Sequence, residues 1–115
     1  MRKLTVEERN AVRECLEGCR DIIEDVRTSY SGRGMYGETC FGVVTEDPMQ
    51  LVGSLSMNLG MSGYDDLAID FYSNACMDSM GLSRIIYFPE IQWDGEEFDD
   101  LDEFFEFEED EEDEE

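Results

Sequence analysis

A long run of acidic side chains at the C-terminal end limits what this 115-residue chain can fold into more than any other feature. Residues 94–115 carry 16 of the 31 Asp and Glu residues and no Lys or Arg. Because like charges repel, such a block favours an extended, solvated segment that attracts basic surfaces. We therefore expect an acidic C-terminal tail over residues 94–115 (22 residues) and a single globular domain over residues 1–93.

Large apolar side chains are set into this tail. They are Phe98, Leu101, Phe104, Phe105 and Phe107. The first four share one face if the segment becomes helical, since they fall three or four residues apart.

Three roles for the tail stay open: docking on a partner, folding back onto the domain, and a purely solubilising role. Docking is the role that we expect. The anchors would then be Phe98, Leu101, Phe104 and Phe105. The carboxylates of Asp99, Asp100, Asp102 and Glu103 would form an electrostatic rim that meets Lys and Arg of the partner.

Charge and hydropathy narrow the classes of partner. The formal net charge is −23, with eight basic residues and no basic stripe that could neutralise phosphates or anionic lipids. No apolar run approaches the length of a membrane span, and the N-terminus has no signal core. We expect a cytoplasmic protein that binds a basic protein rather than nucleic acid or membrane.

Four cysteines, Cys15, Cys19, Cys40 and Cys76, occur without any histidine. In a reducing compartment we expect buried thiols that act as small hydrophobic groups, not disulfides or a metal site. Acid–base chemistry without histidine would fall to other side chains, and the thiols lack an imidazole that would activate them. We therefore expect no enzymatic activity, no metal and no cofactor.

The N-terminal half begins with the clearest helix signal. Thr5 and Glu8 form a capping box, and apolar residues at helical spacing predict a helix of about 22–25 residues that reaches Tyr30. Its charged residues, Arg13 and Arg20 among them, are expected mostly on the opposite, solvated face. Residues 39–44 predict a short buried strand.

The rest of the domain predicts two helices and a strand. Asp47–Pro48 starts a helix that Gly60 ends, and Ser62 with Asp65 starts another that ends near Gly81. Residues 82–88 predict the best strand, continued to Trp93. We expect an α+β fold with a small two- or three-stranded sheet covered by about three helices.

A short part of the tail resembles a known peptide motif. The segment Leu101-Asp102-Glu103-Phe104-Phe105 is similar to the second half of the sliding-clamp-binding peptide of archaeal and eukaryotic replication proteins. The resemblance implies that Leu101, Phe104 and Phe105 plug a hydrophobic pocket of the clamp. Phe98 stands where that family has Gln, and the flanks here are acidic.

The chain also resembles, in size and charge, the small acidic inhibitors that imitate DNA, many of them phage-encoded. Such proteins place carboxylates where phosphates would lie and occupy a basic groove. The function that we expect is a protein-binding regulator or inhibitor of a nucleic-acid-processing or DNA-bound protein.

A glycine-rich loop supports an alternative function. In residues 31–37 the backbone N–H groups of three glycines could hold an anion, with an arginine above it and a tyrosine for stacking. The residues concerned are Gly32, Arg33, Gly34, Tyr36 and Gly37. The alternative is therefore a protein that binds a nucleotide or phosphate ligand, and the simpler interpretation is a glycine-rich connector.

Overall fold

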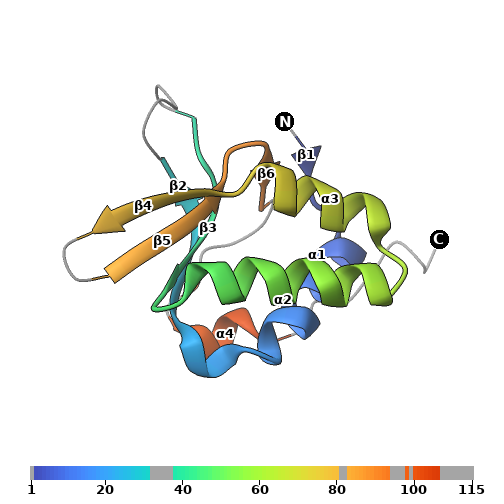
Figure 1. The fold of residues 1–115 in the computed structure, drawn as a ribbon, viewed down its shortest axis with the longest axis horizontal. Coiled ribbons are helices and arrows are strands. Elements are labelled where there is room, and N and C mark those ends of the chain that lie inside the picture. Colours follow the sequence, from blue (N-terminus) through green and yellow to red (C-terminus); the bar gives the residue numbers. More distant parts are fainter. Residues whose placement is uncertain (1, 32–37, 81–82, 94–97, 99, 107–115) are drawn as a thin grey trace.

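The computed structural model describes residues 2–31, 38–80, 83–93, 98 and 100–106, and it confirms an α+β fold. An antiparallel sheet has the strand order β2-β3-β5-β4. The three longer helices gather on one side of this sheet, and the β4–β5 hairpin projects away from them (Figure 1). The described part of the chain therefore has four strands in its main sheet where the sequence predicted two or three.

The first helix is shorter than predicted. The Thr5–Glu8 capping box is present, and α1 (Val6–Glu17) ends before Gly18. After a 3₁₀ turn, η1 (Arg20–Ile22), the chain runs as the edge strand β2 (Ile23–Tyr30). The prediction of a helix up to Tyr30 is wrong.

Irregular pairing explains this error. The β2–β3 register shifts twice, between Ile23 and Asp25 and between Arg27 and Tyr30. A bulge inserts an extra residue, so the buried side chains of Ile23 and Val26 are three positions apart instead of two. A bulged strand thus reproduces the spacing of a helix.

The centre of the fold follows the sequence closely. The strands β3 (Cys40–Thr45) and β5 (Ser83–Phe88) form where expected and pair with each other. The helix α2 (Pro48–Met61) starts as predicted, because the Asp47 carboxylate accepts a 3.2 Å bond from the Gln50 N–H.

The third helix is also shorter than predicted. The helix α3 (Asp65–Ser73) begins after Tyr64, without the expected Ser62 side-chain cap, and ends well before Gly81. Residues 76–80 form β4 (Cys76–Met80), whose backbone pairs with β5. The hydrogen bonds offered by the edge of β5 outweigh the weak local preferences of this segment.

Two short strands form a second, two-stranded sheet. The strand β1 (Arg2–Lys3) runs parallel to β6 (Ile91–Gln92), and the sequence predicted neither as a separate element. This pairing places Arg2 and Lys3 beside Ile91 and Gln92. No described helix is long and apolar enough to cross a membrane.

The main core lies between the sheet and the helices. The Phe41 ring is at its centre, with four rings whose centroids lie 4.8–6.3 Å away. These rings belong to Phe71, Phe88, Trp93 and Phe104. The core therefore joins α3, β5 and the C-terminal segment through one side chain of β3.

The opposite face of the sheet carries a smaller cluster of Cys40, Val44, Ile85 and Tyr87. The Tyr30 ring packs on Tyr87 at 5.0 Å, and its hydroxyl donates to Asp78 of β4 at 3.1 Å. Tyr30 thus spans the sheet from one edge strand to the other and covers this cluster.

The thiols divide into two classes. Cys15, Cys19 and Cys40 are buried and Cys76 is exposed. Burial raises the pKa of Cys15 and of Cys40 from 9.0 to about 11. We expect one rapid reaction with a thiol reagent in the native protein, removed by Cys76→Ser, and three more on unfolding. Two or more rapid reactions would contradict this burial.

The raised pKa values also predict a dependence of stability on pH. Folding favours the protonated thiols, so their contribution is complete below pH 9 and is lost as pH rises towards 11. The free energy of unfolding, measured by urea titration, should fall across that range. Cys76→Ser should leave the fall unchanged, and Cys40→Ala should reduce it.

Two glycines should respond oppositely to substitution by alanine. A Cβ at Gly53 of α2 would meet nothing within 4 Å, so Gly53→Ala should stabilise the fold by about 1 kcal/mol through helix propensity. At Gly42 of β3 the added Cβ would lie 3.2 Å from Ile85 Cδ1 and 3.3 Å from Tyr87 Cβ. Gly42→Ala should destabilise by about 1–3 kcal/mol through overpacking. Urea titration at low protein concentration measures the free energy of unfolding of both variants. A change of the same sign in the two variants would contradict the geometry.

Candidate partner-binding site

The described part of the C-terminal segment folds back onto the domain. Phe104 is fully buried and Phe105 is 8% exposed, while Phe98 and Leu101 are partly buried against the same core. Of the three roles that the sequence left open, the structure shows folding back for these four residues. As placed, they contact the chain's own core, and a partner would reach Phe104 and Phe105 only if the segment detached.

A short helix orders this segment. The helix α4 (Leu101–Phe104) starts at Asp100, whose carboxylate accepts a 2.9 Å bond from the Glu103 N–H. Its first turn carries Asp102 and Glu103, so these carboxylates lie where the helix dipole favours negative charge. An acidic sequence is compatible with a helix here because the helix consists of this turn alone.

Arg13 of α1 holds α4 in place. Its side chain is 1% exposed, and its Nε donates a 2.6 Å bond to the Phe104 carbonyl. The guanidinium carbon lies 5.1 Å from the Trp93 ring centroid, 5.7 Å from Phe98 and 5.5 Å from Phe104. Three aromatic faces around a desolvated cation make each cation–π contact stronger than at the surface.

A second arginine fastens the outer side of the helix. Arg20 forms an ion pair with Asp102, and its guanidinium carbon lies 4.8 Å from the Phe105 ring centroid. The Asp102 side chain is 85% exposed, so the pair is open to solvent and to competing charges. Salt or a basic partner can therefore weaken this contact without disturbing Arg13.

The carboxylates of the segment point away from the core. Asp100, Asp102, Glu103 and Glu106 are exposed, while the aromatic side chains between them are buried. This alternation places the carboxylates at the surface, where the helix cap holds Asp100 and the ion pair with Arg20 holds Asp102. Of the expected rim residues, Asp99 lies outside the described residues, as does Phe107.

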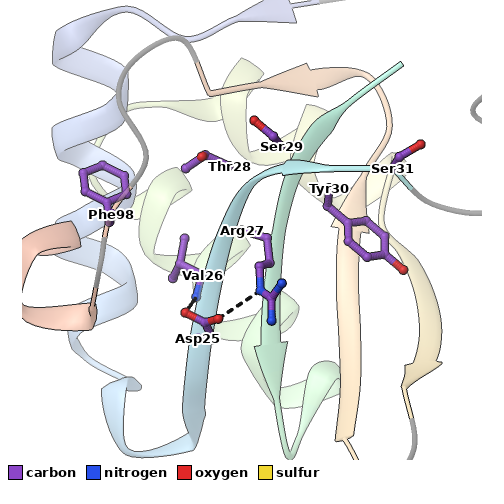
Figure 2. A pocket seen from close by; sticks show the side chains of 8 residues that line it. All are labelled: Asp25, Val26, Arg27, Thr28, Ser29, Tyr30, Ser31 and Phe98. Carbon is purple, nitrogen blue, oxygen red and sulfur yellow. Dashed lines mark hydrogen bonds and ion pairs between the residues drawn. The ribbon is translucent and has the colours of Figure 1, made fainter. Parts of the chain in front are cut away.

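A hollow of about 470 Å³ borders this segment (Figure 2). Residues 25–31, from β2 onward, line one side, and Phe98 lies on the other. The Asp25 carboxylate accepts the Val26 N–H at 2.8 Å and the Arg27 Nε at 2.9 Å. Asp25 thereby satisfies a backbone donor and pairs a charge on an edge strand, which protects the edge from pairing with other strands.

The sequence prediction misplaced the arginines. It put Arg13 and Arg20 on a solvated helix face, whereas Arg13 is buried and Arg20 packs on an aromatic ring. The sequence has eight basic and 31 acidic residues, and this composition does not indicate which arginines are buried. One acceptor of Arg13 is a backbone carbonyl 91 positions away, which no local spacing reveals.

The residues of the alternative ligand site, Gly32, Arg33, Gly34, Tyr36 and Gly37, lie outside the described residues. Ser31, which precedes them, lines the hollow. Among the residues that the structure describes, no group of three or more His, Cys, Asp or Glu side chains could hold a metal ion.

Several described thiols and phenols have raised pKa values. Burial raises the pKa of the Cys15 and Cys40 thiols to about 11, so both stay protonated and weakly nucleophilic near neutral pH. The hydrogen bond to Glu7 raises the pKa of Tyr64, and burial raises that of Tyr30, so both phenols stay neutral. The exposed charges of Asp100, Asp102, Glu103 and Glu106 are negative.

In comparisons with protein-family models, curated proteins and solved structures, nothing matches this chain.

Replacing Arg13 should test how far the fold depends on this side chain. Arg13→Leu removes the bond to the Phe104 carbonyl and leaves that acceptor buried, so the free energy of unfolding should fall by about 3 kcal/mol. Trp93 is the chain's single tryptophan, and its fluorescence should report loosening of the segment.

Arg27→Leu is the matched control, because Arg27 is a half-exposed arginine paired with Asp25. It should change stability by less than about 1 kcal/mol and leave the Trp93 emission unchanged. Equal losses for the two variants would show that Arg13 does not hold the segment.

Proposed function

We propose that this protein is a non-enzymatic, cytoplasmic regulator or inhibitor that binds a basic partner through the carboxylates of its C-terminal segment. The partner class is a nucleic-acid-processing or DNA-bound protein, whose basic groove normally receives phosphates. The observation that carries the proposal is that buried Phe104 and Phe105 hold Asp100, Asp102 and Glu103 outward on one ordered turn.

The aromatic residues have a different role in this proposal from the one the sequence suggested. They position the carboxylates from within the core instead of entering the partner. Charges fixed before binding lose less conformational entropy on association than charges on a free chain. Ordered carboxylates also fit imitation of DNA better than a freely moving tail does.

Arg20 adds a feature specific to this surface. Its exposed ion pair with Asp102 is a contact that Lys or Arg of a partner could replace. Exchanging one such pair for another costs little, because Asp102 is already solvated and screened. The chain's net charge of −23 attracts a basic partner over longer range and speeds the encounter.

Neutralising the turn without unfolding it tests the proposal. In the triple variant Asp100→Asn, Asp102→Asn and Glu103→Gln, the asparagine at the first of these positions can still cap the helix, so Phe104 and Phe105 should stay buried. The full chain should retain basic nucleic-acid-binding proteins from a cell lysate, and DNA should displace them. The triple variant should bind the retained protein about tenfold more weakly, with a smaller dependence on salt.

The control removes the same charge elsewhere. Asp65→Asn, Asp66→Asn and Glu46→Gln neutralise three exposed carboxylates outside the C-terminal segment. This variant should bind nearly as well as the unchanged chain. Equal weakening by the two triple variants would reduce the effect to net charge, and binding that neither changes would refute the proposed function.

A further inference from the structure

The outer face of α2 differs from the rest of this acidic molecule. Its 14 residues include no Asp, Glu, Lys or Arg, in a chain that is 34% charged. Its methionines are well exposed: Met49 at 69%, Met57 at 62% and Met61 at 78%. Solvent-facing positions of a helix usually carry polar or charged side chains. This face exposes three methionines beside Gln50 and carries no charge.

Gly53 lies on the same face. It follows Met49 by four residues and precedes Met57 by four, and four residues bring the helix back to the same side. Nothing in the described structure requires a glycine there, since an added Cβ would meet no atom within 4 Å. A glycine inside a helix is unfavourable, and close approach of another backbone is a reason to keep one.

We propose that this face of α2 binds the same face of a second copy of this chain. In an antiparallel crossing centred on Gly53, the two glycines meet and Met49 of each copy lies over Met57 of the other. The surface is therefore its own complement, as a two-fold dimer requires. Methionine side chains are flexible enough to fill the remaining space.

Charge limits where a second copy can approach. Two copies with a net charge of −23 repel each other, and a face without charge allows them to approach. A basic partner would gain nothing at a surface that carries no carboxylate. A membrane surface is disfavoured because α2 offers no Lys or Arg to the headgroups.

Asp47 and Asp65 set the expected response to salt. Asp47 caps the start of α2, and Asp65 lies near its other end, 3.6 Å from the position of a Cβ on Gly60. An antiparallel pair brings these acidic ends together. Salt screens the repulsion, so dimerisation should strengthen as salt rises, whereas binding of a basic partner should weaken.

Sedimentation equilibrium of the full chain at low and high salt tests the proposal. We expect a monomer–dimer equilibrium that shifts towards dimer in high salt. Met57→Glu should weaken the dimer by about a hundredfold, because it places like charges in the interface. Ile69→Glu is the matched control, since Ile69 of α3 has the same 62% exposure, and it should leave the dimer nearly unchanged.

Gly53→Ala separates an interface role from a structural one. In the monomer the substitution should raise the midpoint of urea unfolding, whereas the dimer should dissociate more readily because a methyl group separates the helices. A monomer at every salt concentration, or a dimer that Met57→Glu leaves intact, would overturn the proposal. Either result leaves the proposed function standing, because that function depends on Asp100, Asp102 and Glu103 and is tested with a different partner.

Discussion

The buried guanidinium of Arg13 is the interaction on which the rest of this structure depends. It joins α1, the end of the β5–β6 region through Trp93, and the C-terminal segment through Phe98 and Phe104. A buried cation is costly unless its donors and its charge are satisfied. The Phe104 carbonyl, the Asn10 side-chain oxygen and three aromatic faces contribute to that requirement here, so the position of the C-terminal segment and the burial of Arg13 depend on each other.

This dependence explains how an acidic sequence becomes an ordered surface. The alternation of aromatic and acidic residues gives the segment an inner and an outer side. The inner side completes a core that Phe41 already organises, and the outer side displays Asp100, Asp102 and Glu103. The uncharged face of α2 is the contrasting surface, and the two differ in the sign of their expected response to salt.

Much of the fold could be predicted from local signals. The Thr5–Glu8 capping box, the Asp47–Pro48 helix start and the apolar strands β3 and β5 all form where their residues indicated. In the main sheet the errors fall on β2 and β4, its two edge strands. Bulges give β2 the burial spacing of a helix, and β4 forms because β5 offers it hydrogen bonds. In both strands the deciding interactions come from distant parts of the chain.

The candidate site also depends partly on local sequence and partly on contacts between distant residues. The sequence by itself determined the concentration of negative charge in residues 94–115, the aromatic residues within it, and the absence of charge from residues 48–61. Only the tertiary structure decided that Phe104 and Phe105 face inward and that Arg13 and Arg20 receive them. The physical reason is that charge and hydropathy belong to each residue, whereas burial depends on contacts such as that of Arg13 with Phe104, 91 positions apart.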